Sequence, residues 1–265
     1  MNKSLTRRLT VVMALAASLL LAACATSPLG RNQLMLFPED QMARMGVTAY
    51  QEIRKETPVN DDPGVRRYVQ CIADHITDEV GGQWEVTVFN KDEPNAFALP
   101  GRKIGVYAGM LDVARNQDQL AAVIGHEIAH VLADHSNERV STAYATQAGL
   151  ELAQALAGEM TQTKQQLFGL LGVGAQVGVI LPFSRKQERE ADLLGLDLMA
   201  RAGFDPRESV DLWQNMAAQA DGAPPEFLST HPSGRSRIQD LRGRMPRAMD
   251  LYRQAHAQGN RPDCR

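Results

Sequence analysis

The sequence HEIAH at residues 126–130 constrains this chain more than any other feature. On an α-helix, residues four apart are separated by about 40° around the axis, so His126 and His130 share one face. Small and apolar residues flank that face, which predicts that both imidazoles are buried and need a partner. Two imidazoles at this spacing can bind one zinc ion at adjacent corners of a tetrahedron. Glu127 projects beside them, where a carboxylate can accept a proton from a zinc-activated water.

A catalytic zinc needs a third protein ligand, which this motif does not supply. His135 follows closely, but on a continuing helix it lies about 140° around the axis from His130. We therefore expect His135 at the surface or capping a helix. The better candidate is Glu188, which shares a helical face with small and apolar residues. A carboxylate that faces the interior needs a compensating charge, and zinc supplies one.

Two other acidic residues lie near Glu188 in the sequence. Glu190 falls on the charged face of the same helix, where solvent and pairing with Lys186 explain it. Asp192 lies one turn after Glu188 on the inward face. Two roles are open for Asp192, either orienting a ligand histidine from behind or donating a proton to the transition state.

The remaining pattern predicts a few strands followed mainly by helices, which is typical of an α+β fold. Helices are expected over residues 38–56, 61–80, 116–139, 184–202, 206–220, 233–245 and 246–258. Strands are expected over residues 84–89, 95–99 and 103–107, with Pro100, Gly101 and Arg102 turning the last two into a hairpin.

The N-terminus has the pattern of an export signal. Positive residues precede the apolar segment Leu9–Leu21, whose 13 residues form a helix of about 20 Å, short of the roughly 30 Å bilayer core. The run LAAC ends at Cys24 and resembles a bacterial lipobox, in which the cysteine becomes lipidated. We therefore predict a signal peptide over 1–23, a lipidated tether over 24–37 and one folded domain over 38–260. An ordinary signal peptide cleaved nearby is the alternative.

The other two cysteines, Cys71 and Cys264, form an even pair in a chain that carries an export signal. Disulfides persist in oxidising compartments, so this pair predicts a disulfide rather than two free thiols. Because a bridge between them would close most of the domain, it would restrict the unfolded chain strongly.

Composition excludes nucleic acid as a partner. Aromatic residues make up only 5% of the chain, the net charge is −3, and no basic run occurs outside the N-terminus. The apolar, glycine-rich segment Leu167–Leu181 is too short to cross a bilayer comfortably. It is a core helix hairpin, a mobile lid over the active-site cleft or a segment that faces the membrane.

The motifs together resemble those of a known family. HEIAH at 126–130 followed by EREAD at 188–192 resembles the H-E-x-x-H…E-x-x-x-D pattern of the HtpX-like and BepA-like zinc metallopeptidases, gluzincins related to the CAAX prenyl endopeptidases. NAFALPG at 95–101 resembles the strand segment before the family's active helix. STHP at 229–232, with Arg237 and Ile238 beyond, resembles its downstream segment.

This resemblance implies a zincin-like α+β domain, mostly helical with a small sheet, that holds one Zn²⁺ per chain. His126, His130 and Glu188 would bind the metal, Glu127 would be the general base and Asp192 the proton donor. Zincins bind substrate extended against a sheet edge, which 95–99 or 102–107 would supply. Such a cleft binds the substrate through backbone hydrogen bonds and therefore suits unfolded polypeptide.

His231 takes one of two opposite roles under the same resemblance. It either occupies the open position of the metal and keeps the enzyme latent, or donates to the oxyanion of the tetrahedral intermediate. Pro232 disfavours helical geometry at His231, so a loop can present the ring. The structural alternative is a histidine that caps the next helix.

The resulting expectation is a zinc metalloendopeptidase that performs protein quality control in a bacterial cell envelope. The resemblance is to the soluble periplasmic lipoprotein branch, so palmitate or a similar lipid on Cys24 would anchor the chain. Ala25, rather than aspartate, follows this cysteine, which favours the outer membrane with the catalytic domain in the periplasm. Expected partners are unfolded or misfolded envelope proteins, the membrane and the outer-membrane assembly machinery.

Two rival functions remain open at this point. One is a chaperone or assembly factor in which the zinc site is blocked. The other is a lipoprotein with a structural zinc, which four protein ligands would close, and His231 is the plausible fourth.

Overall fold

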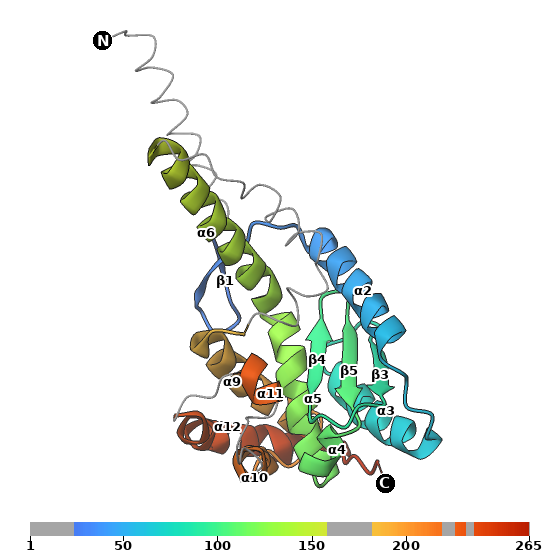
Figure 1. The fold of residues 1–265 in the computed structure, drawn as a ribbon. Coiled ribbons are helices and arrows are strands. Elements are labelled where there is room, and N and C mark those ends of the chain that lie inside the picture. The colour runs from blue at the N-terminus through green and yellow to red at the C-terminus, as the bar shows by residue number, and fades with distance from the viewer. Residues whose placement is uncertain (1–23, 158–181, 219–225, 232–235, 265) are drawn as a thin grey trace, which may run out of the picture.

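The computed structural model describes residues 24–157, 182–218, 226–231 and 236–264. The predicted signal peptide and the segment Leu167–Leu181 lie outside these residues. In Figure 1 a three-stranded sheet lies on one side of helix α5, Gln117–Leu132, and the C-terminal helices lie on its other side. The helix that carries HEIAH therefore runs through the centre of the molecule.

Two helices precede the sheet, as predicted. They are α2, Glu39–Glu56, and α3, Pro63–Asp78. The start of α3 follows from its sequence, because the Asp62 carboxylate accepts hydrogen bonds from the amides of Gly64 and Val65. The apolar stripe of α3 is buried against α5 and the sheet.

The sheet has the order β3-β5-β4, with β3 at Glu85–Phe89, β4 at Ala96–Leu99 and β5 at Lys103–Tyr107. The predicted hairpin is confirmed, since β4 and β5 pair antiparallel, and β3 pairs parallel to β5. Gly101, at φ 84°, provides the left-handed conformation of the turn. Because β5 is central, only β4 of the two predicted candidates lies at a sheet edge, and β4 packs against α5.

The single helix predicted over 116–139 is wrong. The structure ends α5 at Leu132 and starts a second helix, α6, at His135–Ala157. Asp134 between them has φ 52°, a left-handed conformation that stops the first helix. Periodicity along α5 therefore does not determine where His135 points.

Helix α9, Arg185–Arg201, is where the sequence predicts it and begins with a capping box between Ser184 and Gln187. It crosses α5 at two glycines. A Cβ on Gly195 would lie 2.7 Å from the backbone nitrogen of His126, and one on Gly125 would lie 2.9 Å from the Gly195 carbonyl oxygen. The two backbones approach this closely only because neither glycine has a side chain.

The C-terminal part contains α10 at Glu208–Ala218, α11 at Glu226–Thr230 and α12 at Arg237–Ala257. The prediction of two helices that divide at residue 245 is wrong, because Pro246 lies inside α12. An interior proline costs a helix about 3 kcal/mol. Packing of α12 against α9 and α10 offsets that cost, which sequence periodicity does not reveal.

Residues 24–37, which the sequence predicts as a lipidated tether, contain two paired strands. Strands β1, Cys24–Thr26, and β2, Asn32–Leu34, form an antiparallel hairpin that lies against α6. Gln33 is buried there and donates a hydrogen bond of 2.6 Å to the carbonyl of Ala133. The polar residues that made this segment resemble a linker have partners in the folded domain.

The predicted disulfide between Cys71 and Cys264 is confirmed. It joins α3 to the C-terminal segment, which also exchanges hydrogen bonds with Gln117 at the start of α5. No helix among the described residues is long and apolar enough to cross a membrane.

Candidate metal centre

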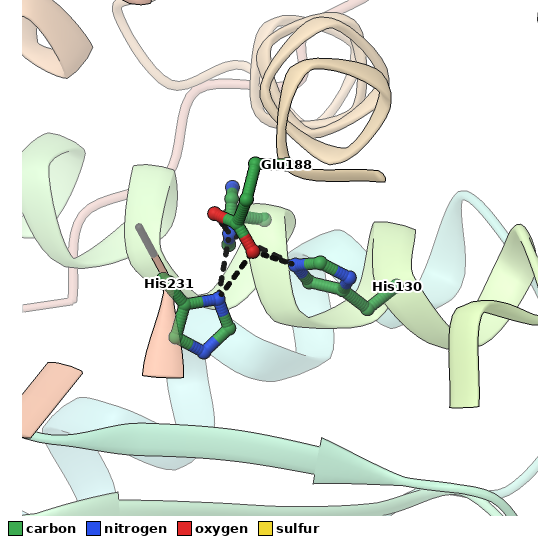
Figure 2. Close-up of side chains that lie close together, drawn as sticks. His130, Glu188 and His231 are labelled. Atoms are coloured by element: carbon green, nitrogen blue, oxygen red, sulfur yellow. Dashed lines mark hydrogen bonds and ion pairs between the residues drawn. The ribbon is translucent and has the colours of Figure 1, made fainter. Parts of the chain in front are cut away.

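Four side chains from three helices converge at one buried point. His126 and His130 come from α5, Glu188 from α9, and His231 directly follows α11. Each is at most 3% exposed. Figure 2 shows the Glu188 carboxylate between the rings of His130 and His231.

The separations between donor atoms fit a tetrahedral zinc ion. Zinc–nitrogen and zinc–oxygen bonds of 2.0–2.1 Å place neighbouring ligand atoms about 3.3–3.4 Å apart. The Nε2 atoms of His126 and His130 are 3.0 Å apart, and each is 3.5 Å from a Glu188 oxygen. His231 Nδ1 is 3.3 Å from His126 Nε2 and 3.1 Å from Glu188 Oε1. Three imidazole nitrogens and a carboxylate oxygen are also the donors that zinc prefers.

A carboxylate supports His126 from behind. The Nδ1 of His126 lies 3.0 Å from Asp192 Oδ1. Arg237 is buried beneath, with its Nε 2.6 Å from Asp192 Oδ2, its Nη2 2.5 Å from Glu188 Oε2 and its guanidinium 3.8 Å from the Trp213 ring centre. Asp192 therefore sits where it can orient a ligand histidine, the first of its two predicted roles. The sequence alone assigns no role to Arg237. The residue stands out there only because it follows the STHP segment that resembles the family.

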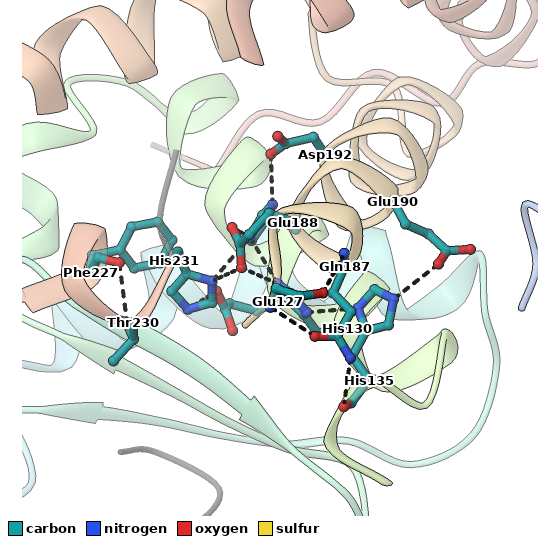
Figure 3. Close-up of polar contacts among 12 residues, drawn as sticks. Glu127, His130, His135, Gln187, Glu188, Glu190, Asp192, Phe227, Thr230 and His231 are labelled. Carbon is teal, nitrogen blue, oxygen red and sulfur yellow. Dashed lines mark hydrogen bonds and ion pairs between the residues drawn. The ribbon is translucent and has the colours of Figure 1, made fainter. Parts of the chain in front are cut away.

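His135 and Glu190 are the two residues that sequence reasoning placed wrongly. The sequence predicts His135 at the surface or capping a helix, but it is 0% exposed and is the first residue of α6. Glu190 is 4% exposed rather than solvated beside Lys186. As Figure 3 shows, His135 lies between His130 and Glu190, with nitrogen–nitrogen and nitrogen–oxygen distances of 2.8 and 3.2 Å. Burial would raise the pKa of Glu190, but hydrogen bonds from His135 and Ser27, among others, lower it to about 2.

Glu127 lies at the meeting point of the four side chains and the sheet edge. Its Oε2 accepts a hydrogen bond of 3.1 Å from the backbone amide of Ala98 in β4. Its Oε1 lies 3.4 Å from His231 Nε2 and has no hydrogen-bond partner among the described residues. Burial raises the pKa of Glu127, which suits a carboxylate that accepts a proton.

The pKa shifts of His130 and Glu188 also fit metal binding. Burial lowers the pKa of His130 well below its ordinary value, so the ring is neutral. Burial alone would raise the pKa of Glu188, but His231 and His126 beside it lower that pKa below its usual range. A neutral imidazole and an ionised carboxylate are the forms that bind a metal.

Comparisons with known proteins agree with this geometry. The sequence profile of peptidase family M48 matches residues 61–245. The mitochondrial metalloendopeptidase OMA1 of Schizosaccharomyces pombe is 37% identical over 213 residues, which cover 77% of this chain and 61% of that protein. OMA1 of Arabidopsis thaliana is 34% identical over 243 residues, which cover 89% of this chain and 48% of that protein.

A bacterial relative is similar as well. The β-barrel assembly-enhancing protease of Escherichia coli K12 is 30% identical over 215 residues, which cover 77% of this chain and 44% of that protein. The chain thus spans about half the length of the relatives it matches. With four converging side chains that could hold a metal ion and a zincin-like α+β fold, this chain belongs to peptidase family M48.

Proposed function

We propose that this chain is a zinc metalloendopeptidase that cleaves unfolded or misfolded polypeptides in a bacterial cell envelope. The observation that carries the proposal is the position of Glu127, a buried carboxylate between the ligand cluster and the edge strand β4. A structural zinc site needs no such carboxylate.

His126, His130 and Glu188 would hold the zinc, which when bound supplies a Lewis acid for a scissile carbonyl and an attacking water. Glu127 would accept the proton of that water at Oε1, which accepts no hydrogen bond from the described residues, and would pass the proton to the leaving amine. Asp192 and Arg237 keep His126 and Glu188 in place through their hydrogen bonds and ion pairs.

The position of β4 supports an extended polypeptide as substrate. β4 pairs with β5 on one side only, and its Ala98 amide touches the general base. A peptide that adds to this edge would be held by backbone hydrogen bonds, which tolerate many side chains, with its carbonyl groups beside Glu127.

The cell-envelope part of the proposal rests on the N-terminal sequence and on one group of relatives. Cys24 follows the predicted export signal and starts the folded hairpin. The Escherichia coli relative is named a β-barrel assembly-enhancing protease. A lipid on Cys24 would hold the domain at the periplasmic face of the outer membrane, near unfolded envelope proteins and the assembly machinery. Replacement of Cys24 by serine should release the protein from membranes, and unchanged membrane fractionation would contradict this assignment.

His231 favours a latent form of the same enzyme as a second candidate. Its Nδ1 is 3.3 Å from His126 Nε2 and 3.1 Å from Glu188 Oε1, the separation expected between two ligands of one zinc ion. In this position His231 would fill the fourth position of the zinc. A chaperone or assembly factor with a blocked site would share this arrangement. The blocked site and the active enzyme differ in whether proteolysis rises when His231 is removed.

Glu127→Gln tests the proposal directly. The variant should bind one zinc per chain, because the ligands remain, and should cleave casein about 10²–10⁴-fold more slowly, because the base is absent. Glu79→Gln, which changes a carboxylate of the ion pair with Arg201, is the control and should cleave like wild type. Wild-type cleavage by Glu127→Gln would show that the mechanism is wrong.

A further inference from the structure

A continuous series of polar contacts leads from the N-terminal hairpin to a metal-ligand histidine. The Nδ1 atoms of His130 and His135 are 2.8 Å apart, and His135 Nε2 is 3.2 Å from Glu190 Oε2. The Glu190 carboxylate in turn accepts hydrogen bonds from the hairpin, 2.5 Å from Ser27 Oγ, 3.1 Å from the Leu29 amide and 3.0 Å from Arg31 Nε.

The direction of these hydrogen bonds follows from the ligand role of His130. Its Nε2 faces Glu188 and His126, so Nδ1 is the nitrogen that carries the proton of the neutral ring. His135 must then accept a hydrogen bond at Nδ1 and donate one from Nε2. The carboxylate of Glu190 accepts this second hydrogen bond. Every donor in the series has an acceptor, and reversing any bond would leave a buried group unsatisfied.

The two ligand histidines therefore have different supports. Asp192 contacts His126 directly and comes from α9, the helix that also supplies Glu188. His130 reaches its carboxylate only through His135, and that carboxylate is held by residues about 160 positions earlier in the chain. Groups behind a ligand histidine fix its ring orientation and its basicity.

We propose that His135 and Glu190 are positioning residues for His130, and that the N-terminal hairpin holds this pair in place through Ser27 and Arg31. The inference rests on the zinc site of the proposed function. It makes the segment that follows Cys24, the predicted lipid attachment point, part of the support of the metal centre.

Two substitutions of His135 separate positioning from simple packing. His135→Asn keeps a carbonyl oxygen that can accept the His130 Nδ1 proton, whereas His135→Leu fills the space without an acceptor. The affinity for zinc, measured by chelator competition, should fall about 10–100-fold in His135→Leu and be largely restored in His135→Asn. The visible absorption bands of the Co²⁺-loaded protein should shift in the leucine variant only.

The control is His256→Gln, which changes a partly buried histidine that contacts the Gly203 carbonyl at 2.9 Å, far from this series of contacts in the sequence. Its zinc affinity and Co²⁺ spectrum should equal those of wild type. Thermal unfolding of the metal-free proteins shows whether each variant folds. Wild-type zinc affinity and Co²⁺ spectrum in His135→Leu would overturn the inference.

The hairpin's part is tested by a second matched pair. Ser27→Ala combined with Arg31→Leu removes the side chains that hold Glu190, together with the ion pair between Arg31 and Glu138. Gln33→Leu also removes a hairpin contact to Glu138, and one to Ala133, but leaves the partners of Glu190 in place. We expect the first variant to bind zinc about tenfold more weakly and Gln33→Leu to bind it like wild type. Equal affinities in both, whether reduced or unchanged, would overturn the role of the hairpin.

Wild-type protein separates failure of this inference from failure of the proposed function. If wild type binds one zinc and cleaves casein while His135→Leu matches its affinity and spectrum, only the positioning role is overturned. If wild type binds no zinc, the proposed function and this inference fail together.

Discussion

The metal centre joins two regions that are built differently. Helices α5 and α9 supply His126, His130 and Glu188, and their backbones touch at Gly125 and Gly195. His231, in contrast, directly follows the five-residue helix α11, where its backbone amide donates to the Phe227 carbonyl at 2.8 Å and its ring stacks on Phe227 with centroids 4.4 Å apart.

The contacts behind each ligand show what this difference means. His126 is backed by Asp192, His130 by His135 and Glu188 by Arg237. The Nε2 of His231 instead lies 3.4 Å from Oε1 of Glu127, the proposed general base. We therefore expect the α5–α9 pair to behave as a fixed site and His231 to be the group that can leave it.

The largest expected effect comes from the disulfide, which joins α3 to the C-terminal segment beside α5. Removing it in Cys71→Ser combined with Cys264→Ser should lower the free energy of unfolding by about 2–5 kcal/mol, because the unfolded chain loses a long covalent loop. Urea unfolding under oxidising conditions measures this difference. Wild-type protein in reductant should unfold like the variant, and an unchanged unfolding free energy in the variant would contradict the prediction.

The next effect should come from the contact between α5 and α9. In Gly195→Ala, the new Cβ would meet the His126 backbone at 2.7 Å, so the two helices must separate. We expect a loss of about 1–3 kcal/mol in unfolding free energy together with weaker zinc binding. Gly243→Ala in α12 is the control, since its Cβ meets nothing within 4 Å. If both variants unfold alike, the close contact does not matter for the site.

The smallest effect should come from His231, the ligand outside the α5–α9 pair. His231→Ala opens the fourth position of the zinc, so casein cleavage should rise about three- to tenfold, a change of about 0.7–1.4 kcal/mol in activation free energy. Unfolding of the metal-free protein should change little. A fall of about 10²–10³-fold would instead assign His231 to the oxyanion, and an unchanged rate would exclude both roles.

Sequence reasoning reached the fixed region because its ligands follow helical periodicity. The spacing of HEIAH and the inward face of Glu188 depend only on residues within one helix, so His126, His130 and Glu188 could be placed together. Cys71 and Cys264 could be paired because an exported chain meets an oxidising compartment and only these two cysteines remain after Cys24. The order β3-β5-β4 needs tertiary contacts, so only the structure identifies β4 as the edge.

What the sequence could not give depends on where segments meet. His135 points inward because Asp134 breaks the helix, and a single residue at φ 52° leaves no clear periodic signal. Glu190 lies on a charged face, and its burial is explained only by the hairpin at 24–37, which composition describes as a linker. Arg237 likewise becomes part of the site only when α12 packs against α9.

The difference between the α5–α9 pair and His231 is tested most directly by measuring the zinc affinities of Glu188→Gln, His231→Ala and wild type. Chelator competition should show that Glu188→Gln binds zinc more than about 100-fold more weakly, a larger loss than that of a supporting residue, whereas His231→Ala stays within about tenfold of wild type. A His231→Ala variant that loses zinc while Glu188→Gln keeps it would contradict the division into a fixed site and a separable ligand.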